Sequence, residues 1–239
     1  MMNDKFIKIC GISSIIATLS YIGTVIFILI AGIGKPESLA TMDQYLLDWS
    51  AVSGLMSVYG WFGILGSLFT IPAILGYYQL LRKEGPMQWI PAAIIYHGVV
   101  LLTLAYIIPL VISHFIAPTY LAESDPSILA SLQVLTHTLR VIEDFFIIIG
   151  TILTLTTGLA ILALIDLKRS ILPKWLNWLA IGTGVLGLGL LGTLGTGVVK
   201  QVFDIVTMIS LGLMLLWMAA IGIIMIIRKE DDVKAIEGK

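Results

Sequence analysis

Long uninterrupted apolar segments dominate the pattern of this chain. The segment 145–165, for example, contains no charged residue. A helix needs about 20 such residues to cross the hydrocarbon core of a bilayer, and the segments lack the strict apolar–polar alternation of a half-buried strand. Six segments of this kind are present, at about 9–33, 51–81, 89–116, 133–165, 175–199 and 203–227.

These segments predict an all-α fold. Within lipid every backbone polar group must be satisfied inside the protein, so long apolar segments form helices. The sequence therefore predicts a polytopic transmembrane bundle of six helices forming a single integral-membrane domain over 1–239. Its predicted connections are 34–50, 82–88, 117–132, 166–174 and a turn near 200–202.

Composition agrees with a lipid environment. Of the 239 residues, 58% are hydrophobic and 12% charged, whereas soluble domains are about 25% charged. The net charge of −1 and the lack of a basic stripe exclude nucleic acid as a partner and leave the bilayer itself.

Basic residues in the connections predict the orientation, because they accumulate on the cytoplasmic side. Only Lys35, Arg140 and Lys200 fall on the predicted outer side. The residues on the other side are Lys5, Lys8, Arg82, Lys83, Lys168, Arg169, Lys174, Arg228, Lys229, Lys234 and Lys239. Both termini are therefore predicted to be cytoplasmic.

Aromatic residues supply a second indication of depth. Trp49 and Tyr120 are predicted at the outer interface, where amphipathic rings accumulate. Trp61 and Trp217 lie deeper in their segments and are predicted to be packing residues.

Small residues predict close helix packing. Gly182, Gly184 and Gly187 match a dinucleotide-binding fingerprint, but no strand precedes them, as that motif requires. Small residues at four-residue spacing let helix backbones approach. Two such seams are predicted: Gly189, Thr193 and Gly197 in the fifth segment, and Ser53, Ser57, Gly60, Ser67 and Thr70 in the second.

Two prolines lie inside predicted helices, Pro72 in the second and Pro109 in the third. Each removes a helical hydrogen bond. The resulting bend is either a tolerated kink or the opening of a pocket or hinge.

A polar stripe on the fourth segment is the main candidate site. His137, Arg140, Glu143 and Asp144 share one helix face. The stripe continues inward as Thr151, Thr154 and Gly158, and is predicted to face the bundle interior.

Three interpretations of this cluster remain open. It is an ion-pair network that ties helix ends together, a polar vestibule for a small ligand, or a metal site. The metal site would draw on His114, His137, Asp144 and Asp204. A zinc ion held by two histidines and a carboxylate could activate water.

His97 is the one ionisable side chain predicted within the hydrocarbon, next to Tyr96. A buried imidazole is expected to be neutral and hydrogen-bonded. Three interpretations of His97 remain open: a structural bond to a neighbouring hydroxyl or carbonyl, contact with a substrate, or ligation of a haem or metal.

The stretch 172–180, Leu-Pro-Lys-Trp-Leu-Asn-Trp-Leu-Ala, leads into a glycine-rich helix and resembles a segment of small six-helix bacterial membrane proteins. That group is classed as a domain of unknown function. The opening at 8–12 and the closing pair Ile221 and Gly222 after Trp217 are also similar. The resemblance implies six spans in a bacterial plasma (inner) membrane and brings no assigned activity, cofactor or site residues.

Three hypotheses about function follow. The leading one is a non-enzymatic membrane protein that binds or passes a small apolar or amphipathic molecule without a cofactor, with His97, Tyr96, His137, Arg140, Glu143, Asp144 and Thr151 as candidate ligand-binding residues. The second is a metal-dependent hydrolase at the outer ends of the third, fourth and sixth helices. The third is a structural or regulatory subunit.

Overall fold

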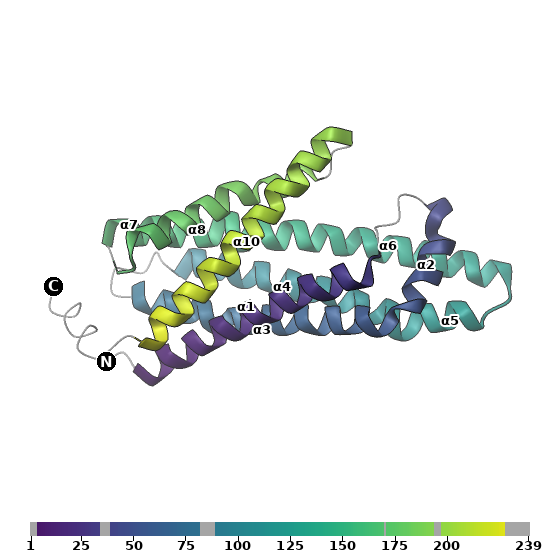
Figure 1. The fold of residues 1–239 in the computed structure, drawn as a ribbon, viewed down its shortest axis with the longest axis horizontal. Helices are drawn as coiled ribbons and strands as arrows, with labels where there is room; N and C mark the ends of the chain where they lie inside the picture. Colours follow the sequence, from purple (N-terminus) through teal and green to yellow (C-terminus); the bar gives the residue numbers. More distant parts are fainter. Residues whose placement is uncertain (1–3, 34–38, 82–88, 170, 194–196, 228–239) are drawn as a thin grey trace.

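The structure, a computed structural model, describes residues 4–33, 39–81, 89–169, 171–193 and 197–227, and its elements there are helices (Figure 1). In the first half these are α1 (Asp4–Ala31), η1 (Leu39–Thr41), α2 (Met42–Ala51), α3 (Ser53–Leu81), α4 (Trp89–Val111), η4 (Ile112–Ile116) and α5 (Ala117–Ala122). In the second half they are α6 (Pro126–Thr151), η5 (Ile152–Leu159), α7 (Ala160–Arg169), α8 (Lys174–Gly187), α9 (Gly189–Gly192) and α10 (Gly197–Ile227).

The predicted all-α fold is confirmed for the described part of the chain. Six helices there are long and apolar enough to cross a membrane. They cover 5–31, 53–81, 89–122, 126–168, 174–192 and 197–227. The third combines α4, η4 and α5, the fourth combines α6, η5 and α7, and the fifth combines α8 and α9.

Three predicted connections are wrong, because helices continue beyond the apolar segments or form between them. Residues 200–202 belong to α10, the predicted loop 117–132 contains α5 and the start of α6, and the predicted loop 34–50 contains η1 and most of α2. Asp125 begins α6 as its N-cap: its carboxylate accepts from the Ser127 amide at 2.8 Å, and Pro126 takes the first helical position. Hydrogen bonds from Ser127 also hold the pKa of Asp125 below its usual range. An Asp-Pro pair is a recognised helix start.

Two stretches of π-helix interrupt the long spans. The first, η4, begins three residues after Pro109, and the second, η5, follows α6 without a break. Such stretches occur often at functional sites.

The spans form a ring. Around it α1 packs on α3, α3 on α4, α4 on α6 and η5, η5 on α8, α8 on α10, and α10 on α1. One end of the ring holds the start of α1 and the end of α10, and we call it the terminal end; α2 and α5 lie at the opposite, far end (Figure 1).

Glycines bring the helices of the ring into close contact. A Cβ added to Gly11 on α1 would lie 2.7 Å from the carbonyl oxygen of Gly222 on α10. From this crossing the two helices diverge toward the far end (Figure 1). A Cβ on Gly98 of α4 would lie 2.6 Å from the carbonyl oxygen of Gly150 on α6.

The predicted packing role of the glycine-rich fifth span is confirmed in part. A Cβ on Gly184 would lie 2.9 Å from Ala160, and one on Gly189 would lie 2.9 Å from Val206 of α10. Gly182 has open space beside it, and Gly197 begins α10 at a φ of 60°, a backbone conformation that favours glycine.

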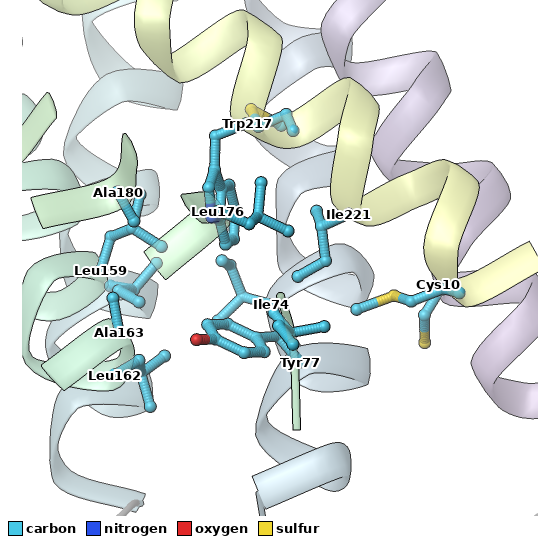
Figure 2. Close-up of a cluster of buried hydrophobic side chains, with 14 of the residues drawn as sticks. Cys10, Ile74, Tyr77, Leu159, Leu162, Ala163, Leu176, Ala180, Trp217 and Ile221 are labelled. Carbon is cyan, nitrogen blue, oxygen red and sulfur yellow. The ribbon is translucent and has the colours of Figure 1, made fainter. Parts of the chain in front are cut away.

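Two groups of buried side chains fill the bundle. One occupies the terminal half and includes Trp217, Tyr77 and Leu176 (Figure 2). The other lies at the far end around Trp49 on α2. The carboxylate of Asp166 is fully buried and accepts from the amides of Ile171 (2.9 Å) and Leu172 (3.1 Å), which joins the end of α7 to the start of α8.

Candidate ligand-binding cavity

A cavity of about 200 Å³ lies inside the ring of helices. Residues of α1, α3, α4, α6, η5, α9 and α10 line it, so each of the six spans contributes to its wall. Along α1 the lining extends from Ser14 to Val25, and along α10 from Thr207 to Ile221. At about 1.5 Å per residue these stretches are about 16 Å and about 21 Å long. The cavity is therefore elongated along the helix axes.

The wall is mostly apolar, and several of its hydroxyl groups donate to the protein itself. Ser14 donates to the carbonyl oxygen of Met218 at 2.6 Å and thereby joins α1 to α10. Thr24, Thr70 and Thr154 each donate to the carbonyl one turn earlier on their own helix, at 3.1, 2.8 and 2.7 Å. A molecule in the cavity would meet mainly aliphatic and aromatic surface, with few free donors.

Two buried polar atoms of the lining residues have no partner among the described residues. Within the described structure, the hydroxyl of Thr207 and the indole nitrogen of Trp217 are buried and have no hydrogen-bond partner. A buried polar group without a partner costs about 1–3 kcal/mol. These two groups are therefore desolvated without compensation in the described structure.

Trp217 forms part of the terminal half of the wall. Its side chain is 2% exposed and lies among Leu176, Ile74 and Ile221 (Figure 2). Its ring meets that of Tyr77 edge to face, with the centroids 5.5 Å apart. The predicted packing role of Trp217 is confirmed, whereas Trp61 is 55% exposed and its predicted packing role is wrong.

The π-helical stretch η5 contributes directly to the wall through Thr154, Leu155 and Leu159. Thr151, the last residue of α6, lines the cavity beside them. The prediction that this part of the stripe faces the interior is thus confirmed: Thr151, Thr154 and Gly158 are all buried. Among the candidate ligand-binding residues predicted from sequence, Thr151 is the one in the cavity wall.

The charged part of the same stripe forms a separate buried group at the far end. Arg140 is hydrogen-bonded and ion-paired to Glu143 one turn later, and their side chains are 13% and 1% exposed. The Arg140 guanidinium lies 5.7 Å from the centre of the Trp49 ring, a cation–π distance. Asp144 on the same helix is half-buried.

Helix α2 covers this ion pair, although the sequence predicted a connection at α2 and not a helix. Trp49 is fully buried and donates to the Ser113 hydroxyl at 2.9 Å, so its ring packs inside the protein. Tyr45, one turn earlier, packs its ring against Trp49, and burial raises its pKa. Beside them Asp43 accepts from the Tyr120 hydroxyl and Gln133 donates to the same hydroxyl at 2.7 Å, which ties α2, α5 and α6 together.

The histidines do not meet. His97 and Tyr96 lie on the exposed surface of α4, and His97 Nδ1 is 2.8 Å from the carbonyl oxygen of Ala93. The expectation of a bond to a carbonyl is confirmed, whereas burial of the imidazole is wrong. His114 is exposed and 3.2 Å from the Ser57 hydroxyl, and His137 is half-buried.

The predicted metal ligands are not brought together. Asp204 is on α10, where it pairs with Lys200 at 3.7 Å. Across the residues that the structure describes, no three His, Cys, Asp or Glu side chains are close enough to share a metal ion. His114, His137, Asp144 and Asp204 therefore form no common site there.

Comparison with known proteins adds no assignment. No family model, curated protein or solved structure matches the chain. The cavity and the residues around it are therefore the features that bear on function.

Proposed function

We propose that this protein is a multi-pass membrane protein that binds a small apolar or amphipathic molecule in the cavity at the centre of its helix ring, without catalysis. The observation that carries the proposal is the elongated apolar cavity to which all six spans contribute. Binding sites for small molecules are typically concave and mostly apolar, with a few polar groups. Threonine side chains such as Thr151 and Thr207 are the few polar members of this lining.

Two further features support binding over a purely structural role. Helix bundles normally fill their interiors to high density, so an open interior is unusual unless it is used. In addition, π-helical stretches are enriched at functional sites, and η5 supplies Leu155 and Leu159 to the wall.

Tryptophan fluorescence tests the proposal. The chain has six tryptophans, and replacing the other five by phenylalanine leaves Trp217 as the only emitter. Because Trp217 is 2% exposed, bromobenzene, a small apolar quencher dissolved in the bilayer, reaches it only through the cavity. We expect bromobenzene to quench Trp217 when the protein is reconstituted into lipid nanodiscs. The Leu211→Phe substitution narrows the cavity and is expected to reduce this quenching.

The matched control is Leu216→Phe, the same change on the same helix. Leu211 lines the cavity, whereas Leu216 is exposed on the outside of the bundle. We expect Leu216→Phe to leave quenching unchanged. Absence of quenching in the parent protein, or equal effects of both substitutions, contradicts a cavity that admits apolar molecules.

We further propose that the terminal end of the bundle faces the cytoplasm of a bacterium and that the far end faces outward. Eleven of the fourteen lysine and arginine residues are predicted on the cytoplasmic side, in agreement with the positive-inside rule. Tags attached at residues 1 and 239 are then accessible only from the cytoplasmic face of sealed vesicles. Access to either tag from the opposite face contradicts this orientation.

A further inference from the structure

We infer that the ligand of this cavity is an acyl chain, which enters sideways from the lipid leaflet at the far end through an opening between α1 and α10. The inference rests on the proposed function and adds the class of ligand and its route. We call this place the α1–α10 opening and define it by Thr24 and Val25 on α1 and Thr207 and Leu211 on α10, all of which line the cavity.

Exposure locates the opening. Val25 lines the cavity and is nevertheless 44% exposed, so the wall reaches the outer surface of the bundle there. Val25 belongs to the first candidate membrane span, so lipid would surround the bundle there. The diverging paths of α1 and α10 separate the two helices toward this end (Figure 1). A molecule from the bilayer can thus enter without crossing water.

The shape and chemistry of the cavity match one extended chain. From Thr207 to Trp217 the wall of α10 is about 15 Å long, and both residues line the cavity. The volume of about 200 Å³ spread over such a length makes it narrow. Because Thr24, Thr70 and Thr154 donate to their own helices, the wall stabilises methylene groups better than a polar molecule.

Polar groups lie at the α1–α10 opening, where the polar part of a lipid would be. Thr207 lines the cavity and its buried hydroxyl has no partner in the described structure, so rotation of the side chain lets it donate to the carbonyl oxygen of an ester or carboxyl group at the head of the chain. Lys200 and Asp204 precede Thr207 by seven and three residues and so share its helix face. Their charges lie nearer the far end than Thr207 and are placed to meet a headgroup.

Brominated lipids test the inference in the protein with Trp217 as its only tryptophan. Bromine atoms on the acyl chains of a phospholipid quench Trp217 only if a chain enters the cavity. We expect Trp217 to be quenched in nanodiscs of the brominated phospholipid. The Thr207→Phe substitution, which fills the α1–α10 opening, is expected to abolish this quenching. The adjacent Met208→Phe, on the exposed surface of α10, retains it. A brominated free fatty acid added to nanodiscs of ordinary phospholipid tests the other source of an acyl chain. Quenching by this acid but not by the brominated phospholipid would identify the ligand as a free fatty acid.

The outcomes separate this inference from the proposed function. If bromobenzene quenches Trp217 but neither brominated lipid does, the cavity binds small molecules and the acyl-chain inference is wrong. If bromobenzene also fails, the proposed function is wrong. Quenching by a brominated lipid that persists in Thr207→Phe places the entrance elsewhere and overturns the route.

Photolabelling supplies the same test in the unsubstituted chain, should the five tryptophan replacements prevent folding. A phospholipid with a diazirine on its acyl chain is expected to label Leu155 or Leu159, which are both 2% exposed and line the cavity. Labels confined to outward-facing residues contradict entry of the chain.

Discussion

Replacing Arg140 by methionine is expected to lower the free energy of unfolding by about 3–5 kcal/mol, because it leaves the buried Glu143 carboxylate without its paired cation. Glu143 is 1% exposed, and the Arg140 side chain, at 13%, is little more accessible. The loss is measured as a shift of the unfolding transition when the protein in mixed micelles is titrated with sodium dodecyl sulfate.

The double variant Arg140→Met, Glu143→Met is the control for charge. Replacing a whole buried ion pair by apolar residues of similar volume is often neutral or stabilising, so we expect the double variant to recover most of the lost stability. If both variants are equally unstable, the role of Arg140 lies in its packing on Trp49 and not in its charge.

Replacing Gly222 by leucine is expected to cost about 3 kcal/mol, at the upper end of the range for overpacked interiors. A Cβ at Gly222 would lie 2.9 Å from the carbonyl oxygen of Gly11 and 2.9 Å from Ile15, so α1 and α10 must separate to admit it. The same unfolding titration measures the loss.

Gly212 on the same helix provides a matched control. A Cβ added at Gly212 would have no other atom within 4 Å. Leucine is also favoured over glycine within a helix by about 0.8 kcal/mol. Gly212→Leu is therefore expected to be neutral or slightly stabilising. Equal losses in the two variants would show that the close α1–α10 crossing does not contribute to stability.

The spans could be predicted from sequence because their determinant is local. A segment such as 145–165 needs only length and apolarity to be recognised. The inward direction of Thr151 and Thr154 was also predictable, since hydroxyl residues continuing a charged helix face avoid lipid.

The cavity could not be predicted, because in a membrane protein the inner and outer faces of a helix are both apolar. Leu211 lines the cavity and Leu216 faces outward, yet the two residues are chemically identical. The same ambiguity explains the tryptophans: Trp217 is buried and Trp61 is exposed, although both lie deep within apolar segments. Only the three-dimensional packing of the spans separates such pairs.

The sequence of α2 has the spacing of an amphipathic helix, but its charged residues concealed that pattern. Met42, Tyr45, Leu46 and Trp49 follow the spacing of an amphipathic helix, and all four are buried. The charged residues between them favoured an exposed connection. Recognising that spacing would have predicted a helix there with Trp49 on its buried face.

A density map of the unsubstituted protein in lipid nanodiscs tests the central claim most directly. The account predicts that the space between Thr207 and Trp217 is open and holds a continuous elongated density that emerges between α1 and α10. Direct contact between the walls across that space, for example between Leu211 and Thr154, with no room for a guest molecule, would contradict it.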